Sequence, residues 1–517
     1  MSKFYITTAI DYVNSKPHVG TAYEKILADA MARWRRLKGD DVYFLMGNDE
    51  HSQKVAEEAA KRALDPHTYC DHMEEEFRKA WARLDIKFDV FIRTTWPQHV
   101  RACQEIFRRI RAKGDIFKAL YNDLYCIGCE ASKKESDLVN GACPNHPGTP
   151  IRRVNEENYF FRLSKYAEPV KKLLQRGDFI DPAFRTNEML QVIENGLQDI
   201  SISRKTTKWG VPIPDDPEQV MYVWFDALIN YITGAGFPDE PDRFKRTWPA
   251  DVHVIGKDIT RFHTVIWPAM LIAADIEPPR MSAVHGFVNL QGEKISKSKG
   301  NVIYPLDISD HFGADSLRYF LLAEVAFGQD GDFTWEKFYA RLNAELANQL
   351  GNLLNRIVSM VEKYCGGAFV APRDPLPGDG PLRDDTLRMV TQVPELMDRW
   401  QFHTALARIM AIVGSTNGYI EAGAPWALNK RGKTAAVANC LYQAAEALRI
   451  CAILLSPIIP SSASKILEQL GLDPAVALRL DAARAWQYIP EGTGVRKGPV
   501  LFQKVDTGTQ GGSGPKA

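Results

Sequence analysis

Two short motifs carry residue types suited to binding phosphate. One is Pro17-His18-Val19-Gly20-Thr21, near the start of the chain, and the other is Lys294-Ile295-Ser296-Lys297-Ser298. The first joins an apolar run, residues 4–10, to a helical pattern, so it is predicted to lie at a helix N-terminus. Backbone N–H groups and the helix dipole bind phosphate at such a place, and Gly20 lets the ligand approach closely. The second motif offers two lysines and two hydroxyls, as a cationic loop would.

Taken alone, either motif is compatible with an ordinary helix start or a solvated loop. Their occurrence together, in this order and in these contexts, is what favours a site for a phosphate-bearing ligand.

A cysteine cluster has the spacing of a zinc site. The pattern is Cys126-x2-Cys129-x13-Cys143-x2-His146. Three sulfurs and one imidazole complete a tetrahedron around Zn²⁺ and leave no position for water, so a structural metal is predicted. The alternative is a chance grouping of reduced cysteines. The other cysteines are scattered through helical patterns, where buried thiols are expected: Cys70, Cys103, Cys365, Cys440 and Cys451.

Three further segments could line a pocket for an amino acid. Asp49, in Gly-Asn-Asp-Glu-His, follows a predicted strand and offers a carboxylate to an ammonium group. Residues 223–231 offer an aromatic wall, and residues 255–263 offer a second strand end that bears a glycine. For the aromatic and histidine side chains of these segments, burial in an ordinary core is the alternative.

The elements that must position these residues follow from the apolar patterns. Residues 4–10 and 42–46 are predicted as buried strands, each followed by a helix, which indicates an α/β fold with a doubly wound parallel sheet of the Rossmann type. Buried-strand patterns return at residues 220–224 and 252–255, where we expect the sheet to resume. A ligand is then expected at the strand ends where the two halves meet.

The change of pattern along the chain predicts five segments. They are the first half of the sheet domain at 1–115, a connective insertion with the cysteine cluster at 116–204, the second half at 205–334, an all-α helical bundle at 335–490, and a C-terminal segment with a disordered tail at 491–517. The tail is predicted to be disordered because its last dozen residues hold few apolar groups.

The charge of the whole chain is balanced, with 64 acidic and 64 basic residues among 517. Net charge therefore does not draw the chain to nucleic acid or to an anionic membrane, and a nucleic-acid partner must be bound by local patches. No uninterrupted apolar run is long enough to span a bilayer, and the polar start leads into a strand instead of a signal sequence. We expect a cytoplasmic protein that does not bind membranes.

The ordered set of motifs resembles the class I aminoacyl-tRNA synthetases, and specifically the methionyl-tRNA synthetases of the bacterial type. Residues 8–21 resemble the first signature of that family, and Lys294 to Ser298 resemble the second. The cysteine cluster lies where the family carries a zinc knuckle. Further matches occur in order at residues 47–51, 201–204, 222–227, 255–259, 352–356 and 425–426, so that the resemblance covers about residues 4 to 505.

This resemblance implies a ligase that makes methionyl-adenylate from L-methionine and ATP. It then transfers the methionyl group to the 3′ end of methionine tRNA, for initiation and elongation of protein synthesis. The implied cofactors are Mg²⁺ with ATP and one structural Zn²⁺. The implied tRNA contacts are at the anticodon and the acceptor end, and we expect a monomer.

The resemblance also implies roles for individual residues. The catalytic set is His18, Gly20, Thr21, Lys294 and Lys297. The ATP set is His18, Gly20, Gly256, Asp258, Lys294, Ser296, Lys297 and Ser298. The methionine set is Ile10, Tyr12, Asp49, Trp224, Ala227, Leu228, Tyr231, Ile259 and His263. The anticodon set is Asn352, Arg356 and Trp426, although helix packing is an alternative role for Trp426. The zinc set is Cys126, Cys129, Cys143 and His146.

The chain departs from the family pattern at a few positions. Thr21 stands where the first signature usually has a second histidine, so a smaller hydroxyl replaces a donor to the phosphates of ATP. Ile295 replaces a methionine inside the second signature, and Leu228 stands where some members have proline. The extra C-terminal tRNA-binding domain of some relatives is not expected here.

Two other functions remain open at this point. One is a class I synthetase for another apolar amino acid. The length of the insertion argues against it, because relatives for leucine, isoleucine and valine carry a larger editing module there. The other is a zinc-containing RNA-binding or scaffolding protein without catalysis, which Thr21 favours and the intact second signature opposes.

Overall fold

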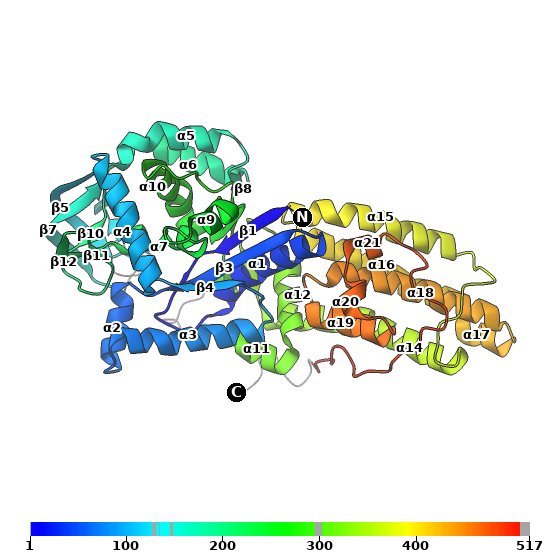
Figure 1. The fold of residues 1–517 in the computed structure, drawn as a ribbon. Coiled ribbons are helices and arrows are strands. Elements are labelled where there is room, and N and C mark those ends of the chain that lie inside the picture. The colour runs from blue at the N-terminus through cyan, green and yellow to red at the C-terminus, as the bar shows by residue number, and fades with distance from the viewer. Residues whose placement is uncertain (1, 127–130, 134, 145–147, 295–301, 507–517) are drawn as a thin grey trace.

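The computed structural model describes residues 2–126, 131–133, 135–144, 148–294 and 302–506. A layered α/β part and an elongated bundle of helices lie side by side (Figure 1). The α/β part holds the chain up to about α12, and the bundle holds the helices that follow.

A seven-stranded parallel sheet lies at the centre of the α/β part. Its strands are neighbours in the order β2-β3-β1-β13-β14-β8, with β4 also paired to β3, and every pair is parallel. The strands are β1 (Lys3–Thr8), β2 (Asp11–Tyr12), β3 (Asp41–Asp49), β4 (Val90–Arg93), β8 (Ile180–Asp181), β13 (Val252–Gly256) and β14 (Ser282–His285). The predicted doubly wound parallel sheet is therefore confirmed, and β1 and β13 lie side by side where its two halves meet.

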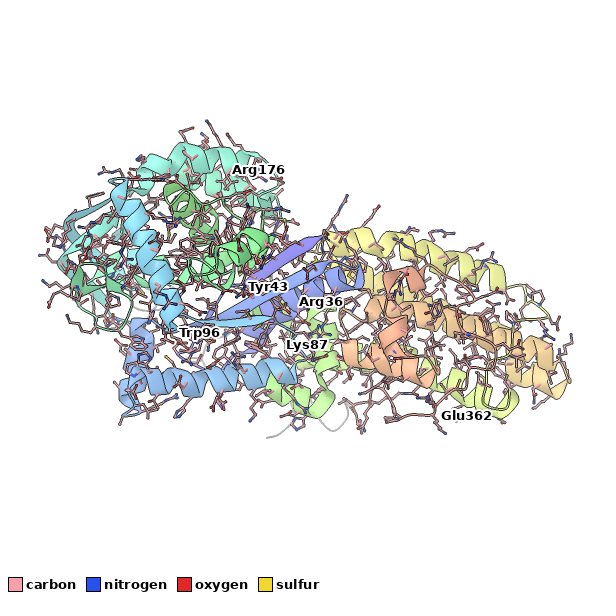
Figure 2. The ribbon with its side chains drawn as sticks, viewed as in Figure 1. Arg36, Tyr43, Lys87, Trp96, Arg176 and Glu362 are labelled. Atoms are coloured by element: carbon pink, nitrogen blue, oxygen red, sulfur yellow. The ribbon has the colours of Figure 1, made fainter. Side chains whose placement is uncertain are left out.

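Helices cover the sheet and connect its strands. Helix α1 (Val19–Leu37) packs against β1 and β3, and the apolar side chains predicted for its inner face, from Ile26 to Trp34, are buried. Tyr43 of β3, labelled in Figure 2, donates its hydroxyl to the Gly234 carbonyl at 2.6 Å. The other helices of this part are α2 (Gln53–Lys61), α3 (Pro66–Arg83), α4 (Pro97–Ala112), α7 (Val223–Ala227), α8 (Asn230–Gly234), α9 (Pro241–Thr247), α10 (Trp267–Ala273), α11 (Pro305–Phe312) and α12 (Ala314–Glu324).

The segment predicted as an insertion is built on a long hairpin. Strands β5 (Ile116–Cys126) and β7 (Ile151–Phe161) pair antiparallel along their whole length. Strands β6 (Ala131–Lys133) and β9 (Ile200–Ser201) complete this sheet, and helices α5 (Ala167–Gln175) and α6 (Phe184–Glu194) follow β7. Between those two helices the chain returns to the parallel sheet and adds β8 at its edge.

The prediction of a sheet strand at residues 220–224 is wrong in two respects. Strand β12 (Asp216–Met221) ends earlier, and it pairs antiparallel with β10 (Ser203–Arg204) and β11 (Pro212–Ile213) in a separate sheet. Residues 223–227 form helix α7 instead. The error has a physical reason, because a short apolar run reads alike in a buried strand and in a buried helix.

The bundle is almost wholly helical, as predicted. Helix α18 (Thr434–Leu455) packs against α14, α15, α16, α17 and α19. It is the one described helix that is long and apolar enough to cross a membrane, and its apolar window is completely buried in the fold, as in a core helix. The other helices of the bundle are α13 (Trp335–Arg341), the π-helix η6 (Leu342–Gly351), α14 (Asn352–Tyr364), α15 (Asp379–Asp398), α16 (Phe402–Gly423), α17 (Pro425–Lys430), α19 (Pro460–Gln469), α20 (Pro474–Ala477) and α21 (Leu480–Ala483).

Candidate active site

A small cavity lies at the carboxyl ends of the central strands. It contains about 300 Å³ of empty space, part of which is open to solvent, and every residue predicted to contact methionine lines it. The lining residues are Ala9, Ile10, Tyr12, Asp49, Trp224, Ala227, Leu228, Asn230, Tyr231, Ile259 and His263. Four separate stretches of the chain supply them, which places the cavity where an open α/β sheet is expected to bind a ligand.

Two aromatic rings, Tyr12 and Trp224, form one wall of the cavity. Trp224 also stacks on Phe262, a residue of the neighbouring larger cavity, with ring centroids 3.9 Å apart and planes 12° apart. The edge contact between Tyr12 and Trp224 has a centroid distance of 6.2 Å. The apolar ring surfaces of this wall suit an unbranched thioether side chain.

A hydrogen bond between Tyr231 and His263 closes the cavity on another side. The Tyr231 hydroxyl lies 2.7 Å from His263 Nε2, and His263 Nδ1 lies 3.0 Å from the Ile259 carbonyl. Because a carbonyl only accepts, Nδ1 carries the proton and Nε2 accepts from Tyr231. Burial lowers the pKa of His263 to about 4, so the ring is neutral at physiological pH. The pocket side chains here are uncharged.

The Asp49 carboxylate lies at the end of β3, with its neighbours fixed by hydrogen bonds. Asp49 is buried and pairs with Tyr12 of β2 in the strand register. The next residue, Glu50, accepts a 2.7 Å hydrogen bond from the Arg93 guanidinium, and its backbone N–H donates to the Thr94 hydroxyl at 2.9 Å. The loop that follows Asp49 is thereby anchored to the end of β4.

A larger cavity of about 1810 Å³ adjoins the small one and shares Ile10, Tyr12, Trp224 and Ile259 with it. Four of the predicted ATP residues line this cavity, His18, Gly20, Gly256 and Asp258, and so does Thr21 of the predicted catalytic set. At Gly256, an added Cβ would lie 2.8 Å from Asp258 Oδ1 and 3.7 Å from the His285 ring. A side chain there would therefore intrude on the polar end of the cavity.

His18 caps the helix that opens at the phosphate motif. Its Nδ1 accepts hydrogen bonds from the backbone N–H groups of Gly20, at 3.1 Å, and Thr21, at 3.3 Å. An accepting Nδ1 leaves the ring proton on Nε2. In this structure the Gly20 N–H, which we expected to face a phosphate, donates to His18 instead.

Two lining residues of the larger cavity escaped the sequence analysis. Glu24 Oε2 lies 3.1 Å from His285 Nε2, and His285 Nδ1 lies 2.7 Å from the Gly286 carbonyl. Burial opposes ionisation of Glu24, but Lys25 and His285 outweigh it and lower its pKa to about 2. His285 ends strand β14, so the rule that ligands lie at strand ends could have identified it.

The second phosphate motif is only partly placed. Lys294 ends strand β16 (Glu293–Lys294), which pairs with β15 (Val288–Leu290), and Val288 lines the larger cavity. Ile295, Ser296, Lys297 and Ser298 lie outside the described residues. The motif thus begins at a hairpin beside the larger cavity.

The predicted zinc ligands are also partly placed. Cys126 ends strand β5 and, like Cys143, is fully buried, and neither forms a disulfide. Two buried thiols in a loop whose described neighbours are mostly exposed fit a metal site of the predicted type. Cys129 and His146 lie outside the described residues. The remaining cysteines follow the prediction, since four are buried and Cys365 is partly buried.

The predicted anticodon residues lie on α14 and α17, at the end of the bundle remote from the sheet (Figure 1). Asn352 is exposed, and Trp426 exposes 37% of its surface. Arg356 forms a 2.8 Å ion pair with Glu421 near the end of α16. A partly exposed tryptophan beside polar side chains is a surface on which an unpaired base could stack.

Comparison with known proteins assigns both parts of the chain. The family model described as tRNA synthetases class I (M) matches residues 4–152 and 147–358. A second model, described as the anticodon binding domain of methionyl tRNA ligase, matches residues 376–511. The chain belongs to the methionyl-tRNA synthetase family.

Methionyl-tRNA synthetase relatives match almost the whole chain. The methionine–tRNA ligase of Caldanaerobacter subterraneus subsp. tengcongensis is 45% identical over 506 residues, which are 97% of this chain and 79% of the relative. That of Synechocystis sp. is 44% identical over 476 residues, which are 90% of this chain and 89% of the relative.

Solved methionyl-tRNA synthetase structures share the fold. The Mycobacterium tuberculosis enzyme in complex with methionyl-adenylate superposes with a TM-score of 0.93 and 42% sequence identity, covering 97% of this chain and 100% of that one. Its free form superposes with a TM-score of 0.86, at 39% identity. These matches make the chain an aminoacyl-tRNA ligase, and both rival functions considered from the sequence are set aside.

Proposed function

We propose that this methionyl-tRNA synthetase activates L-methionine with ATP and then charges methionine tRNA. The observation that carries this proposal is the pair of adjoining cavities: a small one with an aromatic wall and the Asp49 carboxylate, and a large one with the His18 helix N-terminus. A small molecule with an ammonium group and an apolar side chain fits the first, and a nucleotide fits the second.

In the small cavity, we assign the binding of methionine to shape and soft contacts. The methionine side chain lies among Trp224, Leu228 and Tyr231, where contacts between sulfur and aromatic rings contribute about 0.3 to 1.5 kcal/mol each. Its ammonium group is bound by Asp49. The neutral Tyr231–His263 pair places no competing charge beside the thioether.

In the first step, a carboxylate oxygen of methionine attacks the α-phosphorus of ATP. The bond from that phosphorus to the bridging oxygen breaks, and pyrophosphate leaves with the electron pair. His18 donates its Nε2 proton in a hydrogen bond to the phosphates, and Lys294 and Lys297 neutralise the departing pyrophosphate. Gly256 and Asp258 contact the ribose. Mg²⁺ accompanies ATP, bound mainly through phosphate oxygens.

In the second step, a terminal ribose hydroxyl of the tRNA attacks the carbonyl carbon of methionyl-adenylate, and AMP leaves. The related M. tuberculosis structure holds this adenylate, and we carry the intermediate over to this chain. No covalent enzyme intermediate is required. Alignment of bound reactants of this kind can supply about 7–11 kcal/mol of the barrier reduction.

Several finer assignments belong to the same proposal. Asn352, Arg356 and Trp426 contact the anticodon. One Zn²⁺ is held by Cys126, Cys129, Cys143 and His146, and it stabilises the insertion. We also propose the domain division at residues 115, 204, 334 and 490, a monomer as the active form, and a cytoplasmic location.

The first experiment measures exchange of labelled pyrophosphate into ATP with each standard amino acid in turn, without tRNA. Exchange with methionine alone is expected, because activation is reversible and the small cavity offers an aromatic wall to the thioether and the Asp49 carboxylate to the ammonium group. Exchange with a different amino acid would overturn the assignment of the cavity. A folded protein that catalyses no exchange would overturn the activation chemistry, and Thr21 would then be the first position to change.

A further inference from the structure

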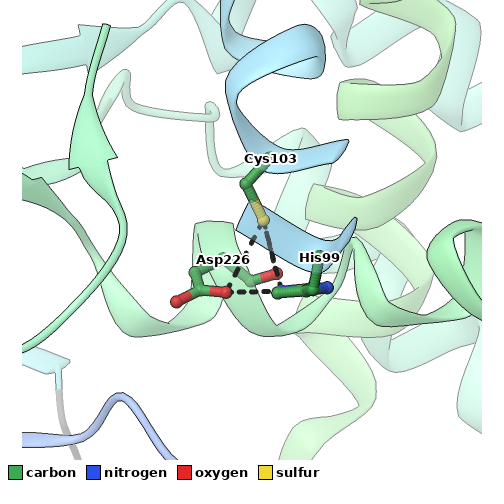
Figure 3. A group of neighbouring side chains, drawn as sticks. All are labelled: His99, Cys103 and Asp226. Atoms are coloured by element: carbon green, nitrogen blue, oxygen red, sulfur yellow. Dashed lines mark hydrogen bonds and ion pairs between the residues drawn. The ribbon is translucent and has the colours of Figure 1, made fainter. Parts of the chain in front are cut away.

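A cluster of buried polar side chains lies directly behind the small cavity. His99 and Cys103, one turn apart on α4, meet Asp226 of α7 (Figure 3). His99 Nε2 lies 2.7 Å from Asp226 Oδ1, and His51 Nδ1 lies 2.7 Å from Asp226 Oδ2. Asp226 and His99 are completely buried, and His51 is 8% exposed. Asp226 thus lies between two imidazoles that come from separate elements.

Hydrogen bonds fix the orientation of the His99 ring. Its Nδ1 lies 3.1 Å from the Thr233 hydroxyl, which also lies 3.0 Å from the Ile229 carbonyl. On the other side of the ring, Nε2 faces a carboxylate oxygen, so it donates to Asp226. His99 is thus held between a hydroxyl on α8 and the carboxylate on α7.

The pKa of Asp226 is consistent with an ionised carboxylate. Burial opposes its ionisation, but His51 and His99 outweigh burial and hold the pKa of Asp226 well below its ordinary value. Unpaired, a carboxylate at this depth would be strongly destabilising. The hydrogen bonds to the two imidazoles are therefore what allows Asp226 to be buried.

This cluster has the wrong geometry for two other roles. Two ligands of one tetrahedral metal ion, each about 2.0 Å from it, would be about 3.3 Å apart, whereas His99 Nε2 and Asp226 Oδ1 are 2.7 Å apart. In a nucleophilic triad, the nucleophile and the carboxylate contact opposite nitrogens of the imidazole. Here the Cys103 sulfur lies 3.2 Å from the same Nε2 that Asp226 occupies.

Asp226 links the cluster to the small cavity through its neighbours in the sequence and through its second hydrogen-bond partner. Its near neighbours Trp224 and Ala227 line the small cavity. Its second partner, His51, follows two residues after Asp49, in the loop after β3. Asp226 thus joins the aromatic wall of the cavity to the loop that carries its carboxylate, and α4 supports the junction from behind.

We propose that Asp226 is a positioning residue for methionine, which holds the Trp224 wall and the Asp49 loop in register through its hydrogen bonds to His99 and His51. This inference rests on the proposed function. Asp226 itself is absent from the lining of either cavity, so its effect is carried by the residues on each side of it. Trp224 borders the larger cavity too, but the predicted ATP residues lie on elements that the cluster does not contact, so the expected effect of losing Asp226 is on methionine.

The test is Asp226→Asn in the full-length enzyme, followed by methionine-dependent pyrophosphate exchange. An amide of the same shape cannot accept from both imidazoles, so the register of the two segments relaxes. We expect kcat/KM for methionine to fall on the order of 10²-fold, as for a displacement of about 1 Å, with KM for ATP unchanged. Equal losses for both substrates, or no loss, would overturn the proposal.

Two further variants separate positioning from general damage. Cys103→Ala removes a neighbour of Asp226 but leaves both imidazole bonds, so both KM values are expected to stay at the wild-type level. Thr233→Val keeps the shape but removes the hydrogen-bond partner of His99 Nδ1, and it is expected to raise KM for methionine alone. If Asp226→Asn does not fold, the comparison of these two variants decides the matter, and equal KM values for methionine would refute the proposal.

Nuclear magnetic resonance provides an independent readout. The ¹⁵N signals of His99 are expected to show a proton on Nε2, the nitrogen that faces Asp226, and a tautomer protonated on Nδ1 alone would contradict this hydrogen bond. Failure of the proposed function is distinguishable from failure of this inference. If the proposed function is wrong, the wild-type enzyme itself catalyses no methionine-dependent exchange. If only this inference is wrong, the wild-type enzyme is active and the variants do not show the expected differences.

Discussion

At the scale of single residues, His18 combines two tasks in one ring. Its Nδ1 caps helix α1 by accepting from the N–H groups of Gly20 and Thr21, and this bond places the ring proton on Nε2. The cap stabilises the helix, while Nε2 is the nitrogen that can donate to a phosphate. Because different nitrogens serve the two tasks, substitutions can separate them.

The variants His18→Asn and His18→Ala are expected to differ in stability and to have similarly low activity. Asn is a good N-cap, so His18→Asn should unfold near the wild-type temperature, whereas His18→Ala should lose about 1 kcal/mol of unfolding free energy. Both lose the phosphate donor, and adenylation should fall on the order of 10²- to 10³-fold in each. Denaturant titrations and pyrophosphate exchange measure the two effects. Wild-type exchange by His18→Asn would remove the imidazole from the mechanism.

His263 makes stability depend on pH in a stated direction. Its pKa falls from an ordinary 6.5 to about 4 in the folded protein, so between these pH values the unfolded state binds more protons. The unfolding free energy therefore decreases as the pH falls through this window, by about 3 kcal/mol at its lower end. Denaturation at pH 7 and pH 4 should show a smaller decrease for His263→Gln than for the wild type. Identical decreases would assign the effect to other groups.

Sequence patterns identified those site residues that lie in a recognisable motif or directly after a predicted strand. The methionine set could be named because its members flank strand ends and signatures, and all of them line one cavity. Glu24 was missed because only its contact with His285, across the fold, makes it a site residue, and His285 was missed because β14, the strand that it ends, was not among the predicted strands. His99 and Asp226 were missed for the same reason as Glu24, since their meeting depends on how α4 packs against α7.

At the scale of elements, the β5–β7 hairpin presents the zinc loop. The two strands pair from Ile116 with Phe161 to Cys126 with Ile151, and β6 pairs with the last residues of β5 and brings Lys133 to the larger cavity. So narrow a sheet has little core of its own at that end. A metal that joins its turns would supply the missing stabilisation.

Replacing Cys126 with Ser is therefore expected to release zinc and to lower the stability of the insertion. Elemental analysis of the purified variant measures the metal, and thermal denaturation measures the stability. Cys365→Ser, at a partly buried cysteine outside the loop, is the matched control and should keep its zinc. Full zinc occupancy in Cys126→Ser would contradict the ligand set.

Elements with strong periodicity were predictable, and those decided by tertiary pairing were not. The strands at β1, β3 and β13 follow from long apolar runs, and the bundle follows from helical periodicity. Strand β8 has two residues, and only its pairing with β14 defines it. The run around residue 222 was assigned to a strand because a short apolar run has no periodicity that would distinguish the buried helix α7 from a buried strand.

At the scale of the whole molecule, α1 connects the nucleotide cavity to the bundle. The helix has 19 residues, so it is about 28 Å long. His18 lies at its start, and near its end Trp34 donates to Asp398 of α15 at 2.8 Å. Midway, Asp29 forms a 2.6 Å ion pair with the buried Arg318, which also donates to the carbonyls of residues 457 and 458 before α19. The two parts are therefore joined by buried polar bonds.

The distance between the two sites predicts a division of labour. Trp426 lies on α17, remote from both cavities (Figure 1), so Trp426→Ala should weaken tRNA binding and leave methionine-dependent exchange unchanged. Loss of one base stack corresponds to about 1–3 kcal/mol, or roughly 5- to 150-fold in affinity. Filter binding measures the affinity for tRNA, and pyrophosphate exchange measures the activation of methionine. Unchanged tRNA affinity in a folded variant would assign Trp426 to helix packing.

The short run from Trp224 to Tyr231 has a consequence for redesign of the enzyme. It supplies five of the eleven residues that line the small cavity and also holds Asp226, whose partners do not line that cavity. Libraries that vary Leu228 or Ala227 can therefore reshape the cavity for other side chains while the backbone keeps its anchor. Libraries that randomise the whole run would break that anchor in most members, and they should yield few active enzymes for any amino acid.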